Sequence, residues 1–405
     1  MMSTSDMPYA IRKGIFDLIT GYANNSDESS KTSKQMSAEE AAVAFLSDEL
    51  EGLFSRYECL NSSPSEIAQK MCEEVIGQDD VIEKIVHVAY FNQLINLAED
   101  LGYGDLPKRN NIILVGDTGM GKTCSINALA NHFKMPLAKY SVDSITSAGY
   151  IGNKVEDVLI RLFEAANRDL WLAERGIIYL DEFDKKREQA TSAGKDINGK
   201  AVQEEILKLL EPSQIDIVLP DRTKVPFKTD KLTIILGGAF VGLDDIRRKR
   251  LCKKTLGFVS NNDGLTDDEI RAKGYIPQDF IDFGYIPECI GRINIIAELR
   301  KLDKDDVLKI IYQGKNSPYI RQTRFIANFL NVDMYISKKF IENVANEVLD
   351  TGTGVRSLES RMINIFYPIR QDAFEHRGED GMCEIYDDGS YMLLYDDMTY
   401  YGMVE

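Results

Sequence analysis

The chain has 405 residues and a formal charge of −17, so it is long enough for two or three domains, and its acidic balance argues against a general nucleic-acid-binding protein. Its six cysteines are scattered and include no C-x-x-C pair, which argues against both a zinc site and a disulfide framework. No apolar run approaches membrane-spanning length, and the N-terminus has neither a signal-peptide core nor a transit-peptide bias. We therefore expect a cytoplasmic protein with no membrane partner.

The first 66 residues differ in character from the rest of the chain. Two helical candidates, residues 11–22 and 41–54, flank a polar segment, residues 24–39, whose composition is typical of a flexible linker. From Glu74 onward the sequence becomes richer in apolar residues. This change predicts a separate N-terminal region, residues 1–66, whose function the sequence alone does not reveal.

A glycine-rich loop follows the first predicted strand. Residues 112–115 are apolar and mostly β-branched, and residues 124–133 have the pattern of a helix. Between them lies G-x-x-x-x-G-K-T, a loop whose backbone N–H groups and following helix N-terminus bind phosphates. In this pattern the lysine reaches the terminal phosphates and the threonine hydroxyl binds Mg²⁺. The nucleotide-binding candidates are Gly116, Asp117, Thr118, Gly119, Met120, Gly121, Lys122, Thr123 and Cys124.

Strand and helix candidates alternate from residue 111 to about residue 240. The strands are residues 111–115, 138–142, 177–180 and 232–236, and apolar residues recur at helical spacing between Val155 and Ala166 and between Val202 and Leu210. Such alternation predicts an α/β fold, with a parallel sheet covered by helices on both faces. Ligands of such sheets bind at the carboxyl ends of the strands, where Gly116 lies.

The last hundred residues have a mainly helical pattern. Residues 303–312, 337–349 and 356–374 are helix candidates, and residues 383–386 and 391–395 flank a turn in a predicted hairpin. We expect a second, smaller domain. The predicted division is residues 1–66, a large α/β domain with the glycine-rich loop at 67–298 and a small helical domain at 299–405.

A second acidic motif, GIIYLDEFDK at residues 176–185, ends another hydrophobic strand. Asp181 can hold Mg²⁺, and Glu182 can orient and polarise an attacking water. The alternative is that the two carboxylates are solvated surface groups at a strand end and have no catalytic role. Paired with the glycine-rich loop, the motif predicts Mg²⁺-dependent hydrolysis of a nucleoside triphosphate.

The order of motifs resembles the ClpX-like AAA+ protein unfoldases, members of the Clp ATPase family that feed the ClpP protease. The resemblance covers roughly residues 70–370. The glycine-rich loop is shared by very many enzymes, whereas the combination of GYIG, GGAF and IPECIGR is far more specific. The motifs are VIGQ (75–78), GDTGMGKT, AGYIG (148–152), LDEFDK, VQEEILKLLE (202–211), GGAFVGLD (237–244), FGYIPECIGR (283–292) and GVRS (354–357).

The resemblance implies further roles in nucleotide binding and hydrolysis. Val75 and Ile76 would line the adenine pocket. Arg292 resembles an arginine finger that reaches the nucleotide of a neighbouring subunit, and Arg356 resembles the sensor-2 arginine, which contacts nucleotide in its own subunit. A polar sensor-1 residue is expected near residues 233–238, without a definite position. An ordinary surface salt bridge is the alternative for each arginine.

The resemblance also implies how substrate and peptidase would be bound. Tyr150 and Ile151 would grip polypeptide substrates in the axial pore of a homohexamer, and Leu256, Gly257 and Phe258 resemble a loop that docks on a ClpP-like peptidase. A tyrosine buried in a turn, and core packing of Leu256 and Phe258, are the alternatives.

The chain departs from the family in three places. Residues 1–66 hold one cysteine, Cys59, so the family's N-terminal zinc-binding domain is expected to be missing. Residues 219–227 lack the Arg-Lys-His loop that reads degradation tags in relatives. In the second pore loop Gly199, Lys200 and Ala201 replace Gly-Glu-Gly. Adaptor binding and tag preference therefore do not transfer.

Four other functions are alternatives to a peptidase-coupled unfoldase. A ring motor that remodels complexes without a protease would share nearly every motif. An HslU-like protein would carry a large insertion, for which residues 124–180 leave no room. A nucleic-acid motor is disfavoured by the acidic charge and the aromatic loop, and an inactive scaffold by the intact set Lys122, Asp181, Glu182, Arg292 and Arg356.

Overall fold

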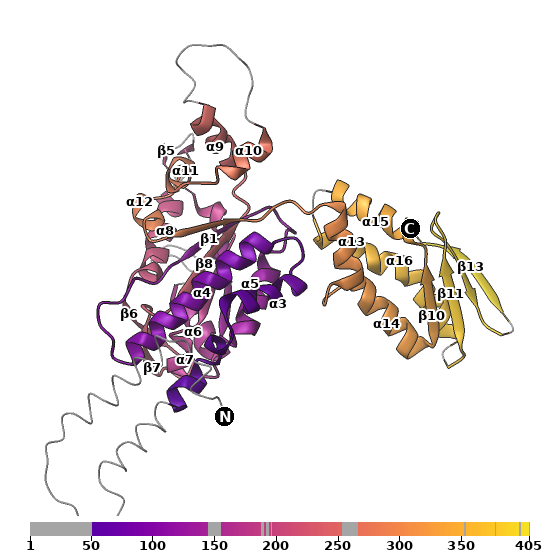
Figure 1. The fold of residues 1–405 in the computed structure, drawn as a ribbon, viewed down its shortest axis with the longest axis horizontal. Coiled ribbons are helices and arrows are strands. Elements are labelled where there is room, and N and C mark those ends of the chain that lie inside the picture. Colours follow the sequence, from indigo (N-terminus) through magenta and orange to yellow (C-terminus); the bar gives the residue numbers. More distant parts are fainter. Residues whose placement is uncertain are drawn as a thin grey trace, which may run out of the picture.

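The structure is a computed structural model that describes residues 51–144, 155–187, 190–191, 194–195, 197–252, 266–351, 354–376, 378–396 and 398–404. Five parallel strands form its central sheet, in the order β2-β3-β8-β1-β9. This confirms the predicted α/β class (Figure 1). The strands are β1 (Ile112–Val115), β2 (Leu137–Ser141), β3 (Ile177–Asp181), β8 (Thr233–Gly238) and β9 (Ile295–Glu298).

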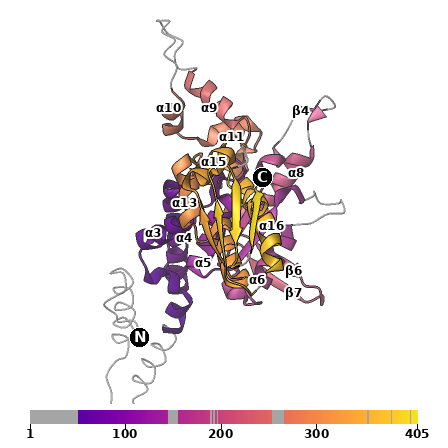
Figure 2. The same cartoon turned by 90° about the vertical axis from the view of Figure 1, so that its right-hand side faces the viewer.

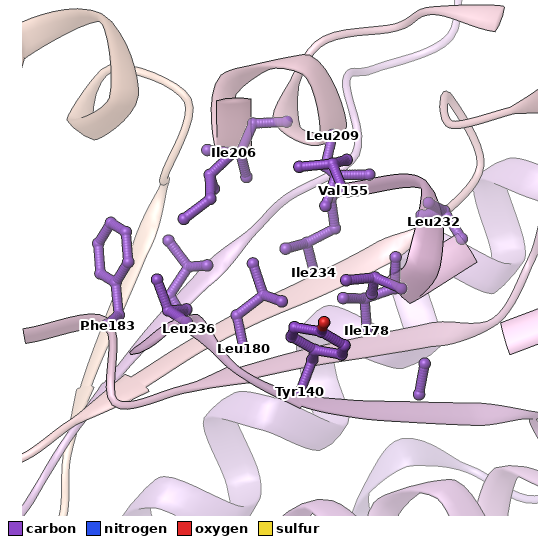
Figure 3. Close-up of a cluster of buried hydrophobic side chains, with 14 of the residues drawn as sticks. Tyr140, Val155, Ile178, Leu180, Phe183, Ile206, Leu209, Leu232, Ile234 and Leu236 are labelled. Carbon is purple, nitrogen blue, oxygen red and sulfur yellow. The ribbon is translucent and has the colours of Figure 1, made fainter. Parts of the chain in front are cut away.

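Strand side chains alternate between the two faces of the sheet, and both faces are buried because helices cover each of them. Ile177 and Tyr179 point to one face, toward a cluster that includes side chains from α3, α4 and α5. Ile178 and Leu180 point to the other face, where Figure 3 shows them beneath side chains of α6 and α8. The helices are α3 (Pro64–Glu74), α4 (Asp79–Asp100), α5 (Lys122–Phe133), α6 (Val155–Ala165) and α8 (Ile197–Leu210).

Local sequence sets where several helices begin and end. Ser63 and Glu66 form a capping box before α3, with Pro64 at its first position. Asp303 and Asp306 do the same for the first helix of the C-terminal part. Helix α8 ends at Leu210, just before the proline at 212 that the sequence marks as a stop.

Shorter elements complete the part of the chain around the sheet. The helices are α7 (Leu170–Ala173), α9 (Leu243–Cys252), α10 (Asp267–Ala272), α11 (Pro277–Phe283) and α12 (Pro287–Ile290). Two hairpins pair β4 (Ala190–Thr191) with β5 (Gly194–Lys195) and β6 (Gln214–Val218) with β7 (Lys224–Lys228). The 3-10 turns are η2 (Glu58–Asn61), η3 (Val142–Ser144) and η4 (Phe183–Lys186).

The C-terminal part has a hydrophobic cluster of its own. Four helices pack against a sheet of order β10-β11-β12-β13, which lies on their far side from the central sheet (Figures 1 and 2). The helices are α13 (Lys304–Gln313), α14 (Pro318–Leu330), α15 (Lys338–Asp350) and α16 (Arg356–Glu375). The strands are β10 (Val332–Ile336), β11 (Gly381–Ile385), β12 (Ser390–Leu394) and β13 (Thr399–Met403).

Most predicted elements have counterparts. The three predicted C-terminal helices correspond to α13, α15 and α16, and the predicted hairpin is β11 with β12. Strand β9, helix α14 and strands β10 and β13 were not anticipated. The domain boundaries stay predictions, but Tyr57 and Leu60 are buried against the central sheet's helices, which favours an earlier start of the large domain than residue 67. Among the described residues, no helix combines the length and apolarity that a membrane crossing requires.

Candidate nucleotide site

The glycine-rich loop leaves the carboxyl end of β1, an inner strand of the central sheet between β8 and β9. Gly119 and Gly121 have φ values of 83° and 102°, which favour glycine. Gly121 precedes α5 without a side-chain cap, so the first N–H groups of α5 stay available to an anion. A Cβ on Gly116 would lie 2.9 Å from Leu299 Cβ, so the start of the loop also requires glycine. The backbone thus forms an open cradle in which main-chain N–H groups can meet an anion.

Lys122 is the first residue of α5, and its side chain folds back over the loop. Its Nζ donates to the Gly116 carbonyl oxygen and, at 3.0 Å, to that of Asp117. Burial lowers the pKa of the Lys122 ammonium, while the carboxylates of Asp181, Asp184 and Asp117 oppose that shift. The lysine therefore stands at the cradle among acidic groups. Thr123 and Cys124, next on α5, are exposed.

Strand β3 places Asp181 and Glu182 at the same edge of the sheet. Asp181 Oδ1 accepts hydrogen bonds from the Tyr179 hydroxyl at 3.0 Å and from the Glu182 N–H at 2.9 Å. Glu182 has a φ of 59°, an uncommon conformation for a residue other than glycine. Its backbone therefore turns sharply where the strand ends.

The Glu182 carboxylate is held by two side chains. Lys185 donates to Oε1 at 2.5 Å, and the Ser141 hydroxyl, at the end of β2, donates to Oε2 at 2.6 Å. These two hydrogen bonds, that from Lys185 first, lower the pKa of Glu182. Ser141 was not among the predicted site residues, although its place near the carboxyl end of a predicted strand was a signal for it.

The segment at residues 75–78 also reaches the glycine-rich loop. Val75 is buried, and its Cγ1 lies 3.9 Å from the position of a Cβ on Gly121, while Ile76 is half-buried beside it. Gln78 is 2% exposed, and its Nε2 donates to the Met120 carbonyl oxygen at 3.2 Å. The structure therefore brings together the predicted adenine-pocket residues and the loop.

The C-terminal part touches the same loop. The Val355 N–H donates to the Gly119 carbonyl oxygen at 3.2 Å, and a Cβ on Gly354 would lie 2.8 Å from that oxygen. Arg356 follows as the first residue of α16, and its charge acts on Lys122. The predicted sensor-2 arginine is thus brought to the site.

Arg292 lies at the other edge of the sheet. The Asn111 side chain, directly before β1, donates to the Arg292 carbonyl oxygen at 3.1 Å, whereas the glycine-rich loop follows the end of β1. Four strand residues separate the two places by roughly 13 Å. The Arg292 guanidinium is exposed and pairs with Glu211 at 2.7 Å. This chain's own loop is therefore not brought together with Arg292.

The other predicted residues divide into three groups. Asp117 and Thr118 are exposed on the loop, and Met120 is half-buried. Thr233 begins β8, at the end remote from the loop, where Asn92 Nδ2 donates to its hydroxyl at 3.1 Å. Predictions on the pore and docking loops lie outside the described residues: Tyr150, Ile151, Leu256, Gly257 and Phe258.

Comparison with known proteins agrees with this geometry. Residues 108–296 match the family described as AAA domain (Cdc48 subfamily). The chain is 34% identical over 308 residues to the ATP-dependent Clp protease ATP-binding subunit ClpX of Borrelia duttonii (strain Ly), covering 74% of this chain and 71% of that protein. It is 34% identical over 309 residues to the protein of the same name from Treponema denticola, covering 74% of each. With this identity across most of both chains, the protein belongs to the ClpX family of AAA ATPases.

Proposed function

We propose that the protein is an ATP-dependent protein unfoldase and translocase that works as a hexameric ring and passes polypeptides to a ClpP-like peptidase. The observation that carries the proposal is the meeting of three segments at one edge of the sheet. These are the glycine-rich loop with Lys122, the Asp181–Glu182 pair, and the Gly354–Arg356 turn of the C-terminal part. Such a site can link the state of a nucleotide to the position of the C-terminal part.

In the proposed mechanism each group has one task. The uncapped N–H groups after Gly121 and the Lys122 ammonium bind the phosphates. Glu182 orients and polarises the attacking water in its ionised form, and its lowered pKa extends that form to more acidic pH. Arg356 contacts the phosphates from the C-terminal part, and Val75 and Ile76 pack on the adenine.

The residues present fit Mg²⁺. The carboxylates of Asp117, Asp181 and Asp184 act on the Lys122 charge, so acidic oxygen donors surround the cradle, and Mg²⁺ prefers such ligands. Asp181 and the exposed hydroxyl of Thr123 would hold the ion. When bound, it would neutralise the phosphate charge that develops during hydrolysis.

The place of Arg292 supports assembly. An exposed arginine at the opposite edge from its own loop serves a nucleotide held by a neighbouring copy. Ring formation would bring the Arg292 guanidinium to the nucleotide of the neighbouring copy, once its ion pair with Glu211 is broken. The grip of Tyr150 and Ile151 on substrate, and docking of Leu256, Gly257 and Phe258 on the peptidase, rest on the family resemblance.

The test uses the purified full chain with Mg²⁺ and ATP, an unfoldable reporter protein and a ClpP-type peptidase from the same organism. Lys122→Ala is expected to abolish ATP binding. Glu182→Gln is expected to bind ATP, to hydrolyse it at least about 100-fold more slowly and to trap assembled rings. Glu205→Gln is the matched control, because Glu205 pairs with Lys208 at the same i,i+3 spacing. Wild-type hydrolysis by Glu182→Gln would refute the assigned role.

The degradation arm decides between the peptidase-coupled function and its alternatives. The wild type is expected to degrade the reporter, and Leu256→Ala/Phe258→Ala to lose degradation while keeping hydrolysis. Hydrolysis and reporter unfolding without degradation would instead identify a stand-alone remodelling ATPase. Strong, salt-sensitive stimulation by DNA would identify a nucleic-acid motor.

A further inference from the structure

The carboxyl end of β8 borders the glycine-rich loop. This end of the strand carries no polar side chain. Gly116 donates its N–H to the Gly238 carbonyl oxygen at 3.1 Å, so this strand end borders the loop directly. The residues there are Leu236, Gly237 and Gly238, and all three are buried. Thr233, the strand's only side chain with a hydroxyl, lies at the opposite end and is bound by Asn92. Among the described residues, this end of β8 therefore offers no polar side chain to the loop.

A hydroxyl from the neighbouring strand fills that space. Tyr179 lies on β3, on the same face as Asp181 because strand side chains alternate. A Cβ on Gly237 would lie 2.3 Å from the Tyr179 hydroxyl oxygen and 2.6 Å from its ring, so Tyr179 occupies the position where a β8 side chain would begin. Tyr179 is 1% exposed, which fixes its ring.

The Tyr179 hydroxyl selects which oxygen of Asp181 is free. Both hydrogen bonds that Asp181 accepts within the described residues, from Tyr179 and from the Glu182 N–H, reach Oδ1. Oδ2 is thereby left for a cation. The shared acceptor also links the orientation of Asp181 to the backbone turn at Glu182.

We propose that Tyr179 is a positioning residue of the nucleotide site: its hydroxyl stands where β8 offers no polar side chain, and it holds Asp181 so that Oδ2 stays free toward Mg²⁺. The inference rests on the proposed ATP-binding function. Through Asp181 Oδ1, the same hydroxyl holds the Glu182 backbone in place. Gly237 belongs to the arrangement, because no larger residue leaves room for the phenol.

The test is Tyr179→Phe, which removes one oxygen and keeps the ring. The readout is equilibrium binding of ATP, with and without Mg²⁺, under conditions that prevent turnover. Affinity without Mg²⁺ is expected to stay unchanged, while the factor by which Mg²⁺ tightens binding is expected to fall about tenfold, the value of one hydrogen bond to a charged group. A parallel titration of the ATPase with Mg²⁺ is expected to require correspondingly higher concentrations.

Tyr140→Phe is the matched control. Tyr140 is also a buried strand tyrosine, but its hydroxyl has no hydrogen-bond partner among the described residues, and its side chain lies on the opposite face of the sheet. It is expected to leave the Mg²⁺ effect unchanged. Gly237→Ala tests the same contact in a second way, because the added Cβ displaces the phenol of Tyr179 without removing its hydroxyl. This variant is also expected to reduce the factor by which Mg²⁺ tightens ATP binding.

The outcomes separate this inference from the proposed function. A wild-type Mg²⁺ effect in Tyr179→Phe, or an equal change in Tyr140→Phe, would overturn the inference and leave the ATPase proposal intact. If Tyr179→Phe does not fold, an unchanged Mg²⁺ effect in folded Gly237→Ala overturns it equally. If the wild-type protein does not bind ATP, both the inference about Tyr179 and the proposed ATPase function are wrong.

Discussion

Glu182 combines a strained backbone with a tightly held side chain. Its φ of 59° is stabilised by the Asp181 hydrogen bond to its N–H, and its carboxylate is shared between Lys185 and Ser141. Such a carboxylate is fixed before any nucleotide arrives. The hydrogen bond from Lys185 is the largest cause of the lowered pKa of Glu182. A substitution of Lys185 therefore tests how this pKa affects activity.

At this scale we predict a pH dependence. A lowered pKa keeps Glu182 ionised below its usual value of 4.5, so the wild-type kcat is expected to show no loss from Glu182 between about pH 5 and about pH 8. Lys185→Met removes the first cause, so the pKa rises and a decline is expected to begin at the acidic end of this range. Lys208→Met, which breaks the Glu205 pair, is the control. Identical profiles for Lys185→Met and the wild type would contradict the prediction.

At the scale of elements, sequence patterns predicted what depends on local order. The run at residues 112–115, the glycines and the lysine lie within one stretch, so the cradle and α5 followed from the sequence alone. Strand β13 was missed because its sequence, TYYGM, has tyrosine or methionine on the exposed side and no polar alternation. Strand β10 pairs with β11, about fifty residues later in the chain, which local periodicity does not detect.

The site was predictable to the same extent. Lys122, Asp181 and Glu182 belong to contiguous motifs, whereas Ser141 meets Glu182 across 41 residues and Gln78 meets Arg300 across 222. These partners work through long-range contacts, and a single sequence carries no record of them. The sensor-1 position stays a prediction, because the described part of β8 offers no polar side chain near the loop that would fix it.

The turn before α16 yields a prediction about this contact between elements. Gly354 has a φ of 60°, and a Cβ there would lie 2.8 Å from the Gly119 carbonyl oxygen. Gly354→Ala is therefore expected to push the turn off the glycine-rich loop and to weaken ATP binding by about tenfold. Gly274→Ala is the control, because Gly274 has a φ of 61° with nothing within 4 Å of the added Cβ. Equal ATP affinities of the two variants would contradict this prediction. They would show that the close approach to the Gly119 carbonyl oxygen adds nothing to the effect of backbone strain.

At the scale of the whole molecule, the buried side chain of Gln78 joins the glycine-rich loop to the segment that connects the central sheet with the C-terminal part. Gln78 Nε2 donates to the carbonyl oxygens of Met120 at 3.2 Å and Arg300 at 2.9 Å, and its Oε1 accepts the Arg300 N–H at 3.0 Å. Arg300 lies between β9 and α13, where Figure 1 shows the chain crossing to the C-terminal part. Its guanidinium pairs with Asp306 of α13 at 2.6 and 2.8 Å.

This arrangement links movement of the loop to movement of α13. Gln78→Ala removes three hydrogen bonds of about 1 kcal/mol each and leaves buried backbone groups unpaired, so the loop and the connection become free to move separately. The expected result is ATP binding within about fivefold of wild type, with a clearly smaller ATP-induced change in the distance between dyes on α4 and α14, measured by energy transfer.

Gln93→Ala distinguishes this coupling from general loosening of the fold. Gln93 is 3% exposed on the same helix, α4, and donates to the Arg175 carbonyl oxygen at 3.2 Å, away from the connection. Gln93→Ala is expected to lose some stability in thermal unfolding, because it also removes a buried hydrogen bond, and to keep the full change in energy transfer. If Gln78→Ala keeps that change as well, Gln78 is not required for the movement, and contacts such as the hydrogen bond from Val355 to Gly119 are sufficient for the C-terminal part to follow the nucleotide.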